Sequence, residues 1–242
     1  MDNTKAIEFN KNEVIAGIVI KLIAILASVY GLYMSIYSAM SFTYFTNLSN
    51  ILIDIVLLIF LVSDIMLLLS KENQKNKKNW LYIVKYMATI SITITFLIYL
   101  TLLAPTNKLG FINAYLNNSA GSLCLHFITP LLAIFDFMLF DYKYSSNKAH
   151  AVFATIPPLL YVVFVVIAAS CGMRWKVDMY APYNFLNFGA ETGWFGFDLS
   201  QLGSKTLGVG VAYMIVVLLL IFIGIGELYL MMKNKRRKSR MK

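Results

Sequence analysis

Six long apolar runs dominate the sequence. Each is long enough to cross the hydrocarbon core of a bilayer as a helix, which takes about 20 residues. The runs lie near residues 14–39, 44–69, 80–103, 119–140, 150–171 and 207–231. They are continuous, whereas the strands of a membrane β-barrel are short and alternate apolar with polar residues. The sequence therefore predicts an all-α polytopic membrane protein, with six transmembrane helices in one bundle and a single integral-membrane domain over residues 1–242.

The composition excludes most soluble classes of protein. Of the 242 residues, 59% are hydrophobic and 14% are charged. Soluble domains have roughly 45–50% apolar residues and about 25% charged residues. The two cysteines are too few for a secreted disulfide scaffold. The first run is too long for the apolar core of a cleaved signal peptide and contains Lys21, so we expect a retained helix.

The net charge of +9 is distributed unevenly between the two sets of loops. The N-terminus, residues 70–79, residues 141–149 and the tail carry fifteen Lys and Arg residues, while the other loops carry four. Positive charge collects on the cytoplasmic side of membrane proteins. We therefore expect a cell-membrane protein with both termini in the cytoplasm.

The basic tail, residues 232–242, allows two interpretations. A basic arm can bind nucleic acid. A basic flank after the last span is also what topology requires, and such a flank binds anionic lipid headgroups. The second interpretation is preferred, so no nucleic-acid partner is expected.

Ionisable residues inside a span are costly and need a reason. One group is predicted to form a belt of ion pairs and snorkelling side chains near the inner boundary, and an ion or proton path is the alternative. This group comprises Lys21, Asp64, Lys85, Asp136 and Glu227.

A second polar group lies in the outer half. Thr46, Asn50 and Asp54 are spaced four residues apart on one helical face, with Thr43 and Asn47 beside them. Such a stripe faces other helices or a wet cavity, because lipid leaves its hydrogen-bonding groups unpaired.

His126 of the fourth run belongs with this stripe. Ser122 and Thr129 share its helical face. The helical rise puts His126 about 10 Å below the outer surface, between Thr46 at about 3 Å and Asp54 at about 15 Å.

This group has the residue types of a nucleophilic site. A histidine base activates a threonine hydroxyl, and a carboxylate can orient the imidazole. Thr46 is the candidate nucleophile, His126 the base and Asp54 the orienting residue, while Asn47 and Asn50 are candidates for the oxyanion site. Ordinary hydrogen bonding between helices is the alternative interpretation. One histidine without clustered carboxylates is a poor ligand set, so neither a metal nor a cofactor is expected.

The outer loop, residues 172–206, is long and strongly aromatic. We expect it either to cap a lipid-facing pocket as a lid or to form an interfacial aromatic belt. The residues assigned to this lid are Trp175, Tyr180, Tyr183 and Trp194.

Prolines and cysteines lead to further expectations. Pro130 is expected to kink the fourth helix and free backbone carbonyls near His126, and Pro157 and Pro158 to act similarly on the fifth. Cys124 and Cys171 are expected to be two ordinary buried thiols, and a disulfide between them is left open.

Four segments occur together in a familiar order. FTYFTNLSN opens the second run, LHFITPLLAIFDFMLF lies in the fourth, IPPLLYVVFVV in the fifth, and APYNFLNFG in the outer loop. From about residue 40 to 225 the chain resembles the androgen-induced-protein family of membrane proteins and its bacterial relatives. Eukaryotic members are threonine hydrolases that cleave fatty acid esters of hydroxy fatty acids.

The resemblance implies Thr46 as nucleophile and His126 as base. The proline after His126 is spaced slightly differently from animal members, and the motif of the second run is closer to the bacterial relatives, whose substrates the resemblance does not supply. The family pattern gives no support to Asp54.

The expected function is an intramembrane lipid-ester hydrolase acting on membrane lipids or fatty acyl esters, with a pocket open to the outer leaflet. The alternatives are a small-solute binding or transport protein, of the substrate-capture type found in vitamin transporters, an acyltransferase with the same nucleophile or with Cys124, and a membrane protein without chemistry.

Overall fold

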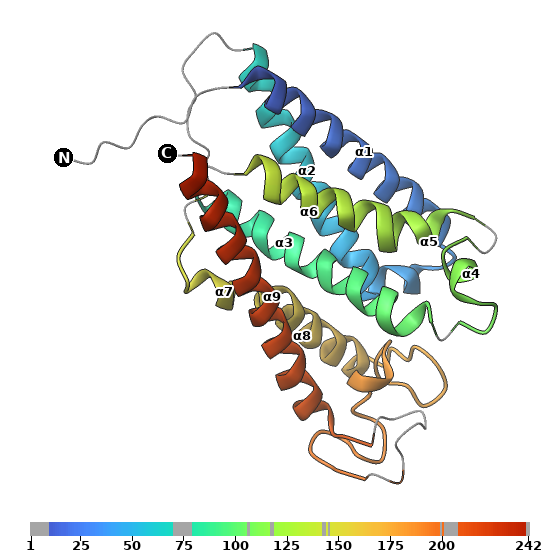
Figure 1. Cartoon of the computed structure of the whole chain (residues 1–242). Coiled ribbons are helices and arrows are strands. Elements are labelled where there is room, and N and C mark those ends of the chain that lie inside the picture. Colours follow the sequence, from blue (N-terminus) through green and yellow to red (C-terminus); the bar gives the residue numbers. More distant parts are fainter. Residues whose placement is uncertain are drawn as a thin grey trace. The chain divides into compact units, whose positions relative to one another are not determined.

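A computed structural model describes residues 10–69, 79–105, 107–116, 119–141, 144, 146–198, 200 and 208–240 (Figure 1). Its elements are α1 (Lys11–Ser35), η1 (Ala39–Thr43), α2 (Phe45–Leu69), α3 (Asn79–Ile98), η2 (Tyr99–Leu103), α4 (Phe111–Leu116), α5 (Gly121–Leu123), η3 (Cys124–Ile128), α6 (Thr129–Phe140), α7 (His150–Phe153), α8 (Ile156–Ser170), η4 (Asn184–Leu186) and α9 (Val211–Arg240). Here η1 and η4 are 3₁₀ helices, while η2 and η3 are π turns.

Among the described residues, six helical segments are long and apolar enough to span a membrane. They are Lys11–Ser35, Phe45–Leu69, Asn79–Thr101, Gly121–Phe140, His150–Ser170 and Val211–Ser239. The predicted all-α polytopic bundle with six spans is therefore confirmed.

Several boundaries differ from the predicted ones by a few residues, and the end of the last helix differs most. The first helix ends at Ser35, four residues early, because the chain turns into η1. The last helix continues to Arg240, through all of the basic tail that the structure describes. Lys and Arg are good helix formers, so the loss of apolar character at residue 232 does not end the helix.

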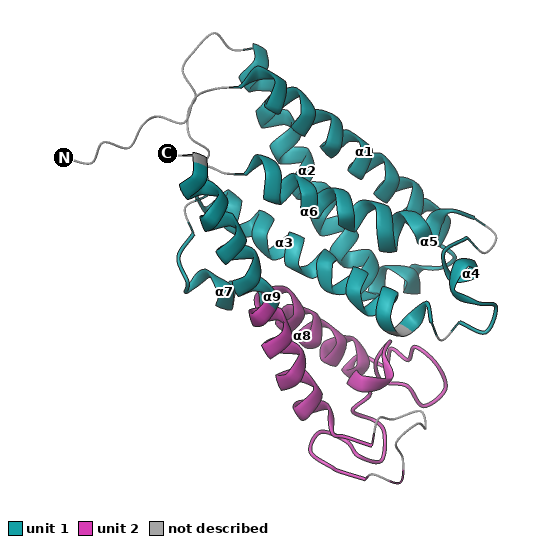
Figure 2. Ribbon diagram, in the orientation of Figure 1, with its two compact units in different colours: residues 1–154, 225–242 teal, residues 155–224 magenta. Residues whose placement is uncertain are grey.

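The chain divides into two compact units (Figure 2). Unit 1 comprises Met1–Ala154 and Ile225–Lys242, and unit 2 comprises Thr155–Gly224. Helix α9 contributes its first part to unit 2 and its second part to unit 1.

In unit 1, helices α1, α2, α3 and α6 pack in a ring, each against the next. Helix α3 is the most enclosed of the described spans. In its apolar stretch 61% of the residues are buried, compared with 39% or less in each of the other spans. The rings of Tyr82, Tyr86, Phe137 and Tyr144 pack together at centroid distances of 5.9–6.5 Å. Aromatic packing thus joins α3 to α6 and to the chain that follows it.

A charge cluster, defined as Lys21, Asp64, Lys85, Asp136 and Asp141, links the four helices of this ring. Lys21 Nζ lies 3.0 Å from Asp64 Oδ2 and 2.6 Å from Asp136 Oδ1. Lys85 Nζ lies 2.5 Å from Asp136 Oδ2 and 2.6 Å from Asp141 Oδ2. The predicted ion pairs are confirmed for Lys21, Asp64, Lys85 and Asp136.

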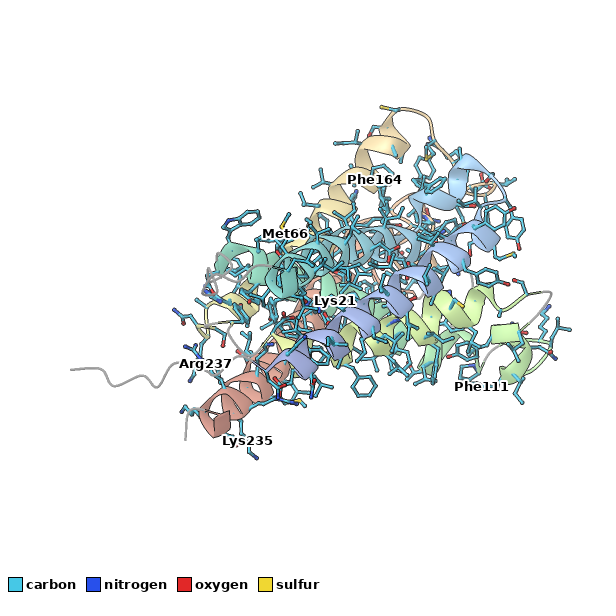
Figure 3. All side chains as sticks on the ribbon, turned by 90° about the horizontal axis from the view of Figure 1, so that it is seen from above. Lys21, Met66, Phe111, Phe164, Lys235 and Arg237 are labelled. Carbon is cyan, nitrogen blue, oxygen red and sulfur yellow. The ribbon has the colours of Figure 1, made fainter. Side chains whose placement is uncertain are left out.

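The predicted snorkelling is wrong for the two lysines. Lys21 and Lys85 are 1% and 0% exposed, and Figure 3 shows Lys21 among the neighbouring helices. Both side chains stay inside because aspartates are available there as partners. Glu227, the remaining member of the predicted belt, lies exposed on α9.

The second part of α9 joins this region. Lys233 is buried, donates to the carbonyl of Phe137 at 2.5 Å and lies over the Phe137 ring. Burial alone would raise the pKa of Asp141, but the charges of Lys85, Lys233 and Lys21 lower it below its ordinary value. Lys235 and Arg237 lie near the end of α9 (Figure 3).

In unit 2, α8 begins with Pro157 and Pro158 in its first turn. The predicted fifth span is interrupted there, because α7 ends at Phe153 and α8 begins at Ile156. Proline lacks the N–H that would continue the preceding helix, but it fits the first turn of a new one.

Candidate functional site

The two π turns, η2 and η3, each begin the same number of residues before a proline. Tyr99 opens η2 six residues before Pro105, and Cys124 opens η3 six residues before Pro130. The N–H of Ala104 donates to the carbonyl of Tyr99, and the N–H of Thr129 donates to the carbonyl of Cys124. Each π turn therefore contains one residue more than an α-helical turn. It lies just before a proline, which interrupts the hydrogen bonding of the helix because it has no N–H.

This arrangement frees the carbonyl of Leu125. The N–H four residues on, at Thr129, already donates to Cys124, and Pro130 has no N–H to offer. Asn50 Nδ2 of α2 supplies the missing donor at 3.4 Å. The expectation that Pro130 releases a backbone carbonyl near His126 is thus confirmed, and the released group ties η3 to α2.

His126 lies in η3, and its ring stacks on Tyr99 of η2. The ring centroids are 3.7 Å apart and the planes differ by 11°. Nδ1 of His126 is shielded from solvent and has no hydrogen-bond partner in the described part of the chain. The two π turns thus meet at a pair of stacked rings, with one imidazole nitrogen unengaged.

Tyr99 is itself firmly held. Its hydroxyl lies 2.7 Å from Ser122 Oγ and 2.5 Å from the carbonyl of Ala114. The ring of Tyr115 packs edge-on against it at 5.0 Å. Burial, and then the neighbouring Tyr99, raise the pKa of Tyr115, so its hydroxyl stays neutral. These contacts fix the plane on which the imidazole rests.

Thr46 is the second residue of α2 and is half-buried. Its carbonyl accepts from Ser49 Oγ and from Asn50 Nδ2, both at 2.9 Å. Ser49 Oγ also lies 3.1 Å from Thr95 Oγ1 of α3. The chain reverses direction between α2 and α3 (Figure 1). Thr46, one turn before Ser49, and Tyr99, one turn after Thr95, therefore lie toward the same end of unit 1.

Thr46 therefore lies at about the level of Tyr99 and the stacked His126. Asn50 connects the start of α2 to η3, because its amide nitrogen donates both to the carbonyl of Thr46 and to the carbonyl of Leu125, the neighbour of His126. No hydrogen bond joins Thr46 to His126 among the residues that the structure describes.

The other predicted site residues have partners of their own. Asn47 Nδ2 donates to the carbonyl of Ser41 at 2.8 Å, which ties η1 to α2. Asn50 has both amide hydrogens engaged, so it has none left for an oxyanion. Asp54 Oδ2 accepts from Ser28 Oγ of α1 at 2.7 Å, and no bond links Asp54 to His126 within the described residues.

Sequence reasoning missed Tyr99, the residue in closest ring contact with His126. A tyrosine in an apolar span is common, so its type alone gives no signal. The equal spacing of Tyr99 to Pro105 and of Cys124 to Pro130 is the signal that was present.

The aromatic loop, described over residues 172–198, packs largely on itself within unit 2. The guanidinium of Arg174 lies 3.8 Å from the Tyr180 ring centroid and donates to the carbonyls of Ala169 and Met173. Phe188 and Trp194 stack at 5.1 Å. Trp175 is buried and Trp194 exposed, while Tyr180 and Tyr183 are half-buried. Thr46 and His126 belong to unit 1, and the lid role stays a prediction.

The sequence also leads to expectations about the two cysteines and about metal ligands. Cys124 and Cys171 are both free thiols, so the disulfide left open by the sequence is not formed. Cys124 is buried as expected, but the expectation is wrong for Cys171, which is exposed where the chain leaves α8. Among the described residues, no group of three or more His, Cys, Asp or Glu side chains is placed to hold a metal ion.

Comparisons with protein-family models, curated proteins and solved structures found no match to this chain.

Proposed function

We propose that this protein is an intramembrane lipid-ester hydrolase in which Thr46 is the nucleophile and His126 the general base. The observation that carries the proposal is the state of His126. Its ring stacks on Tyr99, and its buried Nδ1 has no hydrogen-bond partner in the part of the chain that the structure describes. An imidazole with a free nitrogen, beside a helix whose second residue is a threonine, provides the pair of groups that nucleophilic ester cleavage needs.

The reaction proceeds in two balanced steps. Thr46 Oγ1 attacks the ester carbonyl carbon while the His126 imidazole takes the hydroxyl proton. The tetrahedral intermediate collapses by breaking the carbon–oxygen bond to the alcohol, which receives that proton and leaves an acyl-threonine ester. Water, deprotonated by His126, then releases the fatty acid and restores Thr46.

The negative charge on the intermediate needs hydrogen-bond donors. The first N–H groups of a helix have no partner within the helix, and Thr46 lies at the start of α2. The N–H of Leu48 already donates to the carbonyl of Tyr44, so the N–H groups of Thr46 and Asn47 and the second amide hydrogen of Asn47 are the candidates for the oxyanion site. Asn50 serves as a positioning residue instead, since it holds the carbonyls of Thr46 and Leu125.

The distribution of basic loops supports a cell-membrane location with both termini in the cytoplasm, which puts this site in the outer half of the bundle. Apolar side chains cover the exposed faces of the helices, so a fatty acyl ester can approach laterally from lipid. Membrane lipids or fatty acyl esters are therefore the proposed substrates, and the basic end of α9 is the proposed contact with anionic headgroups.

The test uses the purified full chain in detergent with a fluorogenic medium-chain ester. Thr46→Ala and His126→Ala should each reduce hydrolysis to background, while Thr46→Ser should retain part of it. Thr101→Ala is the matched control, because this exposed threonine only donates to the carbonyl of Leu97. Full activity in both alanine variants would overturn the proposal.

Binding of a small polar solute is the second candidate. It is favoured by the buried, unpartnered Asp54 Oδ1 and His126 Nδ1, which a solute could engage. A serine-reactive fluorophosphonate probe separates the two candidates. Labelling that disappears in Thr46→Ala supports the hydrolase, whereas a co-purified water-soluble ligand with no labelling supports the binder.

A further inference from the structure

Three side chains bring their oxygen atoms together between α1 and α2. This oxygen cluster consists of Ser28, Asn50 and Asp54. Ser28 Oγ lies 2.7 Å from Asp54 Oδ2 and 3.4 Å from Asn50 Oδ1. Ser28 and Asn50 are both 0% exposed, so water does not reach them from outside.

The oxygen cluster contains too few hydrogens for its oxygens. Asn50 turns its amide nitrogen away, toward the carbonyls of Thr46 and Leu125, so only its oxygen faces Ser28. An ionised Asp54 has no hydrogen to donate. Among the described residues, the hydroxyl hydrogen of Ser28 is then the single donor for the three other side-chain oxygens, and Asp54 Oδ1 is shielded from solvent with no partner there.

Within the described residues, the oxygen cluster has no ion-pair partner. Lys21 and Lys85 make their ion pairs with other aspartates, and the described residues show no ion pair to Asp54. A carboxylate in a membrane span without compensating charge is costly. A bound cation would satisfy both the acceptor oxygens that lack a donor and the uncompensated charge of the carboxylate.

We propose that Asp54, Ser28 and Asn50 form a binding site for a monovalent cation, and that the ion is sodium. Carboxylate, hydroxyl and amide oxygens are the ligands that hard cations prefer. A single carboxylate balances one positive charge. Ser28 joins the coordination by turning its hydrogen to a backbone carbonyl of the preceding turn, as helical serines commonly do.

The site is coupled to the π turn through Asn50. Its oxygen faces the oxygen cluster, while its nitrogen holds Leu125 beside His126. Sodium therefore fixes the orientation of the Asn50 amide and with it the contact between α2 and η3. Sodium binding requires these contacts alone and is independent of ester hydrolysis.

The test is a sodium titration of thermal unfolding. The purified full chain is held in detergent at constant pH, and NaCl replaces choline chloride at constant ionic strength. The melting temperature should rise with Na⁺ to a plateau, because an ion that binds only the folded state stabilises it. Potassium should act only at higher concentration, since the ion is larger. Asp54→Asn should abolish the dependence on Na⁺.

Two further variants test the ligands separately from folding. Ser28→Ala removes one ligand and should raise the half-maximal Na⁺ concentration about tenfold, as expected for losing about 1.4 kcal/mol of binding. Ser35→Ala is the matched control on α1, since its hydroxyl only donates to the carbonyl of Gly31, and it should titrate like the wild type.

Direct binding of ²²Na⁺ to the wild type and to Ser28→Ala decides the matter if Asp54→Asn does not fold. Weaker binding in Ser28→Ala supports the site. A melting temperature that rises with falling pH but ignores Na⁺ would show that a proton supplies the charge, and it would overturn the proposal. A Na⁺ effect that persists unchanged in Asp54→Asn would overturn it too.

Discussion

Asp136 binds two lysines at once, Lys21 of α1 and Lys85 of α3. All three side chains are buried. Their attraction offsets the cost of removing each charge from water, but only while every member is present. The contact therefore fixes which helices are neighbours more than it adds free energy relative to an apolar core.

Replacing one member should expose this dependence. In Asp136→Asn the two lysines lose their shared counter-charge, and we expect a loss of about 3–5 kcal/mol in the free energy of unfolding. Denaturation in mixed micelles by increasing SDS measures the loss. Glu227→Gln is the control, because Glu227 is exposed on α9 and should change the free energy little. Equal losses in the two variants would contradict the role of the charge cluster.

Tyr99 offers a second prediction at the residue scale, which rests on the proposed hydrolase. Tyr99→Leu removes the ring on which His126 stacks and should lower kcat by up to about tenfold, the equivalent of one aromatic contact. Tyr99→Phe keeps the ring, loses only the bonds to Ser122 and Ala114, and should restore most of the rate.

The pH dependence of kcat is the decisive measurement for Tyr99. A positioning role predicts that the profile shifts in Tyr99→Leu and returns in Tyr99→Phe, because the surroundings of His126 change only in the first. A uniform loss of rate with an unchanged profile would mean that Tyr99 merely supports the fold.

At the scale of elements, η3 depends on the missing N–H of Pro130. Pro130→Ala supplies an N–H that can complete the helical ladder, so η3 should relax toward an α-helix. The extra residue of the π turn is then lost, and Leu125 no longer needs Asn50 as a donor. His126 should leave Tyr99, with a fall in ester hydrolysis.

Hydrogen exchange measures this change directly. Amides of residues 121–135 should exchange more slowly in Pro130→Ala, and the fold should be as stable as the wild type or more stable, since proline inside a helix costs about 3 kcal/mol. Pro158→Ala is the matched control, because Pro158 lies in the first turn of α8, where a proline needs no N–H partner, and the change should leave the exchange of η3 unchanged. Faster exchange at η3 in Pro130→Ala would contradict the explanation.

The elements that the sequence predicts best are those governed by one dominant force. Run length and apolarity decide whether a helix spans, and all six spans were predicted. The end of α9 at Arg240 was not, because hydropathy reports the preference for lipid and not the hydrogen bonding that continues a helix into water.

The candidate site was predictable only in part, for a related reason. Depth along two helices placed His126 between Thr46 and Asp54, and in the structure the elements that carry Thr46 and His126, α2 and η3, are in contact. The stack on Tyr99 and the bond from Asn50 to Leu125 depend on how neighbouring helices are rotated. Rotation follows from contacts among several helices, which the periodicity of one run does not contain.

At the scale of the whole molecule, orientation in the membrane remains the prediction with the largest consequence. It decides whether the Thr46 end of unit 1 faces the exterior. The fifteen basic residues on one set of loops, against four on the other, predict that the tail is cytoplasmic.

The native cysteines provide a direct test of orientation. Cys171 is exposed at the end of α8 and Cys124 is buried, so a membrane-impermeant maleimide should label only Cys171 in intact cells. Ser239→Cys, introduced into a Cys171→Ala chain, should be labelled only after the membrane is opened. One span, α9, separates these two positions, so they must lie on opposite sides of the membrane. Labelling of residue 239 but not 171 in intact cells would reverse the orientation and put the Thr46–His126 region in the inner half, where its substrates would have to come from the cytoplasmic leaflet.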